Sequence, residues 1–100
     1  MIDINVYLNK TYEVKLNNRL LHVYEPTNAM YVECIQRENT DETVDKFAEF
    51  QCQKVSEFLS RNTEKVKVTK QEIEKLPRSA VVEVYKVLLL IAYTAVKDPN

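Results

Sequence analysis

The last stretch of the chain, Ser79 to Lys97, most constrains the fold, because it predicts a helix of about five turns that is apolar over most of its surface. Leu90 lies within the narrow polar strip that remains. A helix of this kind must be covered, either by the rest of its own domain or by another chain. The residues that share its broad apolar face at helical spacing are Val81, Val84, Tyr85, Leu88, Leu89, Ala92, Ala95 and Val96.

The distribution of charge argues against a membrane span, a secreted location and a nucleic-acid partner. The charge-free run in the last helix, Val87 to Val96, is far shorter than the roughly 20 apolar residues that a bilayer core requires. The first residues contain neither the positive region nor the apolar core of a signal peptide, so we expect a cytoplasmic protein. A net charge of −1 provides no basic footprint for nucleic acid. A chain of 100 residues predicts a single domain, 1–100.

Three segments in the first quarter of the chain predict β-strands. Ile2 to Leu8 and Thr11 to Leu16 both alternate apolar and polar residues, the pattern of a half-buried strand. The two residues between them, Asn9-Lys10, predict the turn of a β-hairpin. Arg19 to Tyr24 is a candidate third strand, and the edges of so small a sheet favour pairing with a second copy. We therefore expect a homo-oligomer.

The remainder of the chain predicts helices. A short helix is expected from Ala29 to about Arg37, and a longer one, capped by Thr40 or Asp41, from there to about Arg61. A further short helix, Lys70 to Lys75, is preceded by a capping-box pattern. The sequence thus predicts an α+β fold: an N-terminal antiparallel β-hairpin or three-stranded sheet, then about four helices, the last of them long and apolar.

No residue pattern predicts catalysis, a cofactor or a metal ion. The chain lacks glycine, which removes Gly-rich phosphate loops, dinucleotide fingerprints and nucleophile elbows. His22 is the only histidine, and Cys34 and Cys52 do not have the spacing of metal ligands. An enzyme that uses Asp41 and Asp45, such as a nuclease or hydrolase, is the least favoured class, because acids at a helix start are explained by the helix dipole. We expect a non-enzymatic protein.

Part of the apolar surface is predicted to bind another protein. Phe50 lies off the core stripe of its helix, between charged neighbours, and is a candidate contact residue. On the last helix, the residues that extend beyond an ordinary core face are further candidates. The predicted protein-binding residues are Phe50, Val87, Leu90, Ile91 and Tyr93.

The order of the segments and their local motifs are also similar to those of one known family. The first motif is NKTYEVKL, Asn9 to Leu16, and the second is LLHVYEPT, Leu20 to Thr27. They are followed by FLSRN, Phe58 to Asn62, by TKQEIEKLP, Thr69 to Pro77, and by the final apolar helix. Across nearly all of its length the chain resembles the small tail assembly chaperones of long-tailed bacteriophages and of prophages of Gram-positive bacteria.

This resemblance implies a specific role in the cytoplasm of a bacterial host cell. Such chaperones bind the long, apolar tape-measure protein and keep it soluble until tail-tube subunits polymerise around it. The implied partners are thus the tape-measure protein and, as a second candidate, the tail-tube protein. The alternative is a structural adaptor or tail completion subunit of a phage or mobile element, which is also oligomeric and chemically inert.

Overall fold

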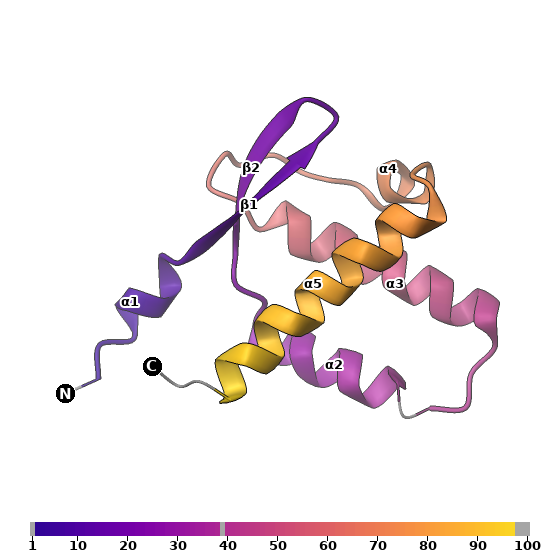
Figure 1. The fold of residues 1–100 in the computed structure, drawn as a ribbon, viewed down its shortest axis with the longest axis horizontal. Helices are drawn as coiled ribbons and strands as arrows, with labels where there is room; N and C mark the ends of the chain where they lie inside the picture. Colours follow the sequence, from indigo (N-terminus) through magenta and orange to yellow (C-terminus); the bar gives the residue numbers. More distant parts are fainter. Residues whose placement is uncertain (1, 39, 98–100) are drawn as a thin grey trace.

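The computed structural model describes residues 2–38 and 40–97, with side chains up to residue 94. It confirms the α+β class, with a two-stranded antiparallel hairpin followed by helices (Figure 1). The side chains of Ala95 and Val96, expected on the core face of the last helix, lie outside the described part. The elements in chain order are α1 (Asn5–Leu8), β1 (Thr11–Leu16), β2 (Arg19–Tyr24), α2 (Asn28–Glu38), α3 (Val44–Ser60), α4 (Lys70–Glu74) and α5 (Arg78–Lys97).

The hairpin consists of the second and third predicted strands. Val14 pairs with Leu21 and Leu16 with Arg19, so the turn between β1 and β2 is Asn17-Asn18. Both turn residues have positive φ, 49° and 67°. A two-residue hairpin turn needs two left-handed residues, and asparagine accepts that conformation better than any other residue except glycine. In a chain without glycine, Asn17-Asn18 therefore decides where the hairpin forms.

The prediction of a strand at Ile2 to Leu8 is wrong, and so is the alternative of a three-stranded sheet. Residues Asn5–Leu8 form the short helix α1, and the sheet in the described part of the chain has two strands. Asn9 has φ −100° and ψ 0°, not the left-handed conformation of a hairpin turn. Lys10 is a poor second residue for such a turn, so the alternating segment has no partner strand.

Helix α3, and not the last helix, is the centre of the fold. It packs against α5, α4 and β2, and Val55, Phe58 and Leu59 are fully buried. Figure 1 shows α5 crossing α3 and α2. In this view α2 lies below α3, and α4 and the hairpin lie above it. The helix begins at Val44 behind the cap Thr43, whose hydroxyl accepts from the N–H of Lys46, so the expected caps Thr40 and Asp41 are wrong.

Helix α5 occupies the position expected for the last helix, but the expectation that it is apolar over most of its surface is wrong. One face is buried through Val81, Tyr85 and Leu88, whereas Glu83 and Lys86 are exposed on another side. Among the described residues, no helix combines the length and the apolar character that crossing a membrane would require. Helix α5 is therefore an amphipathic helix that the rest of the domain covers on one side.

Helix α4 confirms the predicted capping box. The Thr69 hydroxyl accepts from the Glu72 N–H at 3.2 Å, and the Glu72 carboxylate accepts from the Thr69 N–H at 3.5 Å. The same carboxylate pairs with Arg19 at 2.9 Å. Because Arg19 is the first residue of β2, Glu72 both caps the start of α4 and holds the hairpin against this helix.

A polar cluster at the end of α3 fixes the chain that follows it. The buried Asn62 amide donates to the carbonyls of Leu59 at 2.7 Å and Val66 at 2.8 Å, and its oxygen accepts from the Val66 N–H at 2.9 Å. The hydroxyls of Ser56 and Ser60 both donate to the carbonyl of Val68, at 2.7 Å and 2.9 Å. The segment from Val66 to Val68 is extended but pairs with no strand of the described part of the chain, and these bonds provide hydrogen-bond partners for its backbone groups at Val66 and Val68.

The hairpin is attached to the same end of α3. Val23 forms a β-bridge with Asn62, and the N–H of Thr63 donates to the carbonyl of His22 at 3.0 Å. The carboxylate of Glu64 accepts from the His22 backbone N–H at 2.8 Å and lies 2.7 Å from the His22 Nδ1. These two hydrogen bonds lower the pKa of Glu64 to about 2, and the bond to Glu64 raises the pKa of His22 above 6.5.

Asn62→Ala should destabilise the protein by about 1–3 kcal/mol, because it leaves the part-buried N–H and C=O of Val66 and the carbonyl of Leu59 without their side-chain partner. The free energy of unfolding, measured by urea denaturation, tests this. Gln71→Ala, at an exposed position, is the matched control and should change stability by no more than about 0.5 kcal/mol. Equal effects of the two substitutions would show that the Asn62 cluster does not hold the connector.

The His22–Glu64 pair should make stability depend on pH in two directions. The raised pKa of His22 gives stability that is complete below 6.5 and is lost as the pH rises through the folded-state pKa. The lowered pKa of Glu64 gives stability that is complete above 4.5 and is lost as the pH falls toward about 2. The pair therefore contributes most between pH 4.5 and 6.5.

His22→Gln tests the alkaline side of this profile. Urea denaturation at about pH 6 and about pH 9 should show a loss of stability with rising pH in the parent protein and a smaller loss in the variant. An unchanged pH dependence in His22→Gln would mean that other groups cause it.

Candidate functional site

An apolar groove lies between α2 and α5. Its volume is about 340 Å³. Each helix contributes residues over about two turns, which makes the groove about 10 Å long. The lining residues are Tyr31, Ile35 and Glu38 of α2 and Lys86, Leu89, Leu90 and Tyr93 of α5.

Helix α2 forms one wall because two adjacent stripes of its surface are apolar. Met30 and Cys34, four residues apart, are buried against the core. Tyr31 and Ile35 follow them by one position, so they lie about 100° further round the helix and remain half-buried at its edge. The first stripe anchors α2, and the second faces the groove.

Polar contacts hold this wall in place. Lys54 of α3 is buried and forms ion pairs with Glu33 of α2 and with Glu57, the latter at 3.1 Å. Burial acts to lower the pKa of Lys54, but the hydrogen bonds that its ammonium group donates to these two carboxylates outweigh burial and raise the pKa. At the other end of α2, Arg37 pairs with Glu42 at 2.7 Å and lowers the pKa of that carboxyl group.

Helix α5 forms the second wall with residues at the border of its buried face. Leu88 and Ala92 are buried, while Leu89 is half-buried beside them. Leu90 is 63% exposed and Tyr93 47% exposed, and both line the groove. Large apolar side chains exposed together in a concave surface are typical of a site that binds another apolar group.

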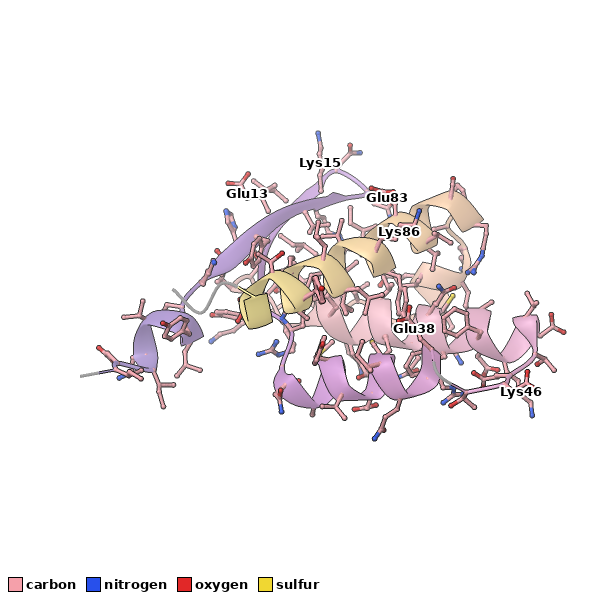
Figure 2. All side chains as sticks on the ribbon, turned by 60° about the horizontal axis from the view of Figure 1, so that its bottom comes forward. Glu13, Lys15, Glu38, Lys46, Glu83 and Lys86 are labelled. Carbon is pink, nitrogen blue, oxygen red and sulfur yellow. The ribbon has the colours of Figure 1, made fainter. Side chains whose placement is uncertain are left out.

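One end of the groove is charged. Figure 2 shows Lys86 on α5 above Glu38 at the end of α2, so one charge of each sign marks this end. The rest of the lining is apolar or aromatic. A partner that fits must therefore present apolar side chains along the groove and tolerate polar groups at this end.

The core beside the groove contains no activated nucleophile. Burial raises the pKa of the Cys34 thiol, which keeps it protonated and unreactive near neutral pH. Burial also raises the pKa of Tyr85. The Tyr85 hydroxyl makes no well-formed hydrogen bond to a described residue, although the Cys34 thiol lies near enough to influence its pKa. Cys34 and Cys52 are both free thiols.

The structure places only two of the five predicted contact residues in the groove, Leu90 and Tyr93. Val87 is 36% exposed and lies outside the lining. Ile91 and Phe50 are each only 9% exposed and belong to the core, so the expected exposure of these two side chains is wrong. Ile91 follows Leu88 by three residues and therefore lies on the buried face of the helix.

Phe50 is buried, and the ring of Phe47 and two cationic side chains contact its ring. Its ring stacks on Phe47 with centroids 6.3 Å apart, and the guanidinium carbon of Arg37 lies 4.7 Å from its centroid. The ammonium group of Lys54 lies 5.6 Å from the same ring. Of these two cations, Lys54 is a charged neighbour of Phe50 on α3, whereas Arg37 comes from α2.

Sequence reasoning missed five groove residues: the charged pair Glu38 and Lys86, and the apolar or aromatic Tyr31, Ile35 and Leu89. Leu89 was expected on the core face of the last helix, and Tyr31 and Ile35 lie at helical spacing on one side of α2 together with the buried Met30 and Cys34. The available signal was the width of the apolar stripe on α2, where Met30 and Tyr31 are adjacent and Cys34 and Ile35 repeat the pair. A stripe two residues wide on a short helix extends beyond a single packed face.

The other candidate clusters do not form a site. Asp41 and Asp45 are both exposed, the former before α3 and the latter in its first turn. His22 is engaged by Glu64, with Glu13 at 3.8 Å from its Nε2. Within residues 2–38 and 40–94, no group of three or more His, Cys, Asp and Glu side chains is arranged to hold a metal ion.

Comparison with known proteins identifies no relative. No protein-family model matches the chain, and neither a curated protein nor a solved structure matches it. The groove between α2 and α5 is therefore the feature from which a function must be argued.

Proposed function

We propose that the protein is a non-enzymatic assembly chaperone that holds an apolar helical segment of a partner in the groove between α2 and α5. In the family that the sequence resembles, the partner is the tape-measure protein of a phage tail, and we propose the same partner here. The observation that carries the proposal is the exposure of Leu90 and Tyr93 in an apolar groove.

The dimensions of the groove support a helix as the bound element. A groove about 10 Å long accommodates about two turns of helix, enough for apolar side chains at positions i, i+3, i+4 and i+7. Burying a leucine side chain contributes about 1.5–3 kcal/mol, so Leu90 offers a substantial share of a transient binding energy. One groove of this size binds weakly by itself, and several copies along one rod would bind by avidity.

The second candidate is a structural adaptor or tail completion subunit that remains in the finished particle. The exposed apolar residues before β1, including Ile2 and Ile4, favour this class, since a permanent assembly would cover them. Mass spectrometry of purified particles separates the two functions. A chaperone is absent from the particle, whereas an adaptor is present in fixed stoichiometry.

Leu90→Asp should weaken binding of the partner at least tenfold, because it removes the exposed leucine and places a charge in an apolar site. The measurement is co-expression with the tape-measure protein encoded nearest this gene, followed by size-exclusion chromatography with light scattering. The parent chain should form a soluble complex, and Leu90→Asp should not.

Val87→Asp is the matched control, because Val87 is exposed on the same helix and lies outside the groove. It should leave the complex intact. Substitution of Ile91 is unsuitable, since Ile91 is in the core and its replacement by a charged residue would unfold the protein. A complex that survives Leu90→Asp would contradict the groove as the binding site.

A further inference from the structure

The outer edge of β1 carries backbone groups that face away from the hairpin. Glu13 of β1 lies opposite His22 of β2. The His22 N–H donates to Glu64 and its carbonyl accepts from the N–H of Thr63, so both backbone groups of His22 face away from β1. Opposite residues of an antiparallel pair either exchange both hydrogen bonds or both face away from each other. The N–H and C=O of Glu13 therefore lie along the outer edge.

The same alternation places the backbone groups of Thr11 and Lys15 on this edge. Among residues 2–38 and 40–94, no hydrogen bond is made to the outward N–H or C=O of Thr11, Glu13 or Lys15. No proline or bulge interrupts β1, and its register with β2 is continuous. A straight strand edge with open donors and acceptors can accept a further strand.

The two charged side chains of this edge have opposite signs and are exposed. The Glu13 side chain is 70% exposed, and its carboxylate lies 3.8 Å from the Nε2 of His22 within the same hairpin. Lys15 is exposed and forms no ion pair with a described residue. Figure 2 shows both side chains projecting from the hairpin on the side away from the helices. Both charges are therefore accessible to a strand that pairs with β1.

We propose that the β1 strands of two copies pair edge to edge and antiparallel, about a two-fold axis at Val14, so that one sheet runs through both copies. Glu13 of each copy then lies opposite Lys15 of the other copy and exchanges both backbone hydrogen bonds with it. On the inner face, Val14 lies opposite its own equivalent and Tyr12 lies opposite Leu16. Tyr12 and Val14, which are only half-buried at the border of the core, gain cover from the second copy.

The charges select this register over its neighbours. The outward backbone groups recur at every second residue, so the pairing can shift only in steps of two residues. A shift one way places Glu13 opposite its own equivalent, and a shift the other way does the same for Lys15. Like charges directly opposite each other are destabilising, and a parallel pair in register would also place identical charges side by side. Only the register about Val14 makes both charge pairs complementary.

Charge and symmetry together favour a second copy as the occupant of the edge. A strand of another sequence would need a cation and an anion at matching positions, whereas a second copy supplies them by symmetry. A two-fold contact uses the same surface on both chains and closes at two copies. It leaves no β1 edge open to further addition. The pairing thus satisfies the edge without forming an open filament.

Oligomeric state tests the proposal through a change of charge. Sedimentation velocity over a dilution series should show the parent chain as a dimer at about 100 µM that dissociates on dilution, because a short strand contact is at the small end of specific interfaces. Glu13→Lys and Lys15→Glu should each weaken the dimer about tenfold or more, since each places like charges opposite each other at both pairs. A parent chain that remains monomeric at this concentration would overturn the proposal.

Mixing the two variants provides the sharper result. An equimolar mixture of Glu13→Lys and Lys15→Glu should form a heterodimer, because every facing pair is again complementary. A chain that carries both substitutions should dimerise with itself as the parent does. Lys46→Glu, at an exposed position of α3, changes the net charge as Lys15→Glu does and should leave the dimer intact. A mixture that associates no more than either variant alone would overturn the proposal.

Cross-linking tests the register, in a chain with Cys52→Ser that removes the half-buried native thiol. Oxidised Val14→Cys should form a disulfide-linked dimer, since facing residues of this kind have Cα atoms about 4.5 Å apart. Tyr12→Cys, on the same face, is the matched control and should not cross-link, because its equivalent lies roughly 14 Å away. A cross-link at Tyr12→Cys, or none at Val14→Cys, would contradict the proposed register.

The strand pairing and the proposed function use different surfaces, so they fail separately. No described residue of β1 lines the groove between α2 and α5. Leu90→Asp should abolish solubilisation of the tape-measure protein and leave the dimer intact, whereas Glu13→Lys should dissociate the dimer. A monomeric parent chain that solubilises this client would overturn the pairing and leave the proposed function standing. A dimer that does not solubilise the client would support the pairing alone.

Discussion

The hydrogen bonds at the C-terminal end of α3 determine how the rest of the chain can be arranged. Asn62 closes the helix and binds both polar groups of Val66, while Ser56 and Ser60 hold the carbonyl of Val68. The hairpin docks on the same segment through the bridge between Val23 and Asn62. A two-stranded hairpin is marginal by itself, so its attachment to a buried helix is what stabilises it. The chain entering α4 depends on the same bonds.

The groove forms where the packing of α2 against α5 stops. Helix α5 is covered by α3 along one face, and α2 covers only part of the next face, which leaves Leu89, Leu90 and Tyr93 along an open edge. Ion pairs from α3 to α2 set the position of this edge. A small domain buries a limited fraction of its surface, and here the groove concentrates part of the apolar area that remains, at Leu89, Leu90 and Tyr93. Such concentration is typical of proteins that bind other chains.

The charged residues in this molecule act mainly as structural supports. Lys54 is buried between Glu33 and Glu57 and also covers the ring of Phe50. Removing its charge would leave the Phe50 ring partly uncovered and two carboxylates without their cation. Glu64 has the same function at the hairpin, where it holds both the backbone and the ring of His22. The Lys54–Glu33 pair holds the α2 wall of the groove, and none of Lys54, Glu33 or Glu64 lines the groove itself.

The sequence by itself determined the α+β class, the strands at 11–16 and 19–24, the order of the helices and the capping box of Thr69 and Glu72, because each depends on periodicity or on residues close in the chain. Only the tertiary structure decided which helix is central, that Phe50 and Ile91 are buried, and that α2 meets α5 at a groove. The alternating segment 2–8 shows why: its pattern fits a strand, but a strand requires a partner, and among the described residues the hairpin turn that provides one is Asn17-Asn18. A local pattern specifies which face is apolar, whereas what covers that face is set by packing between distant segments.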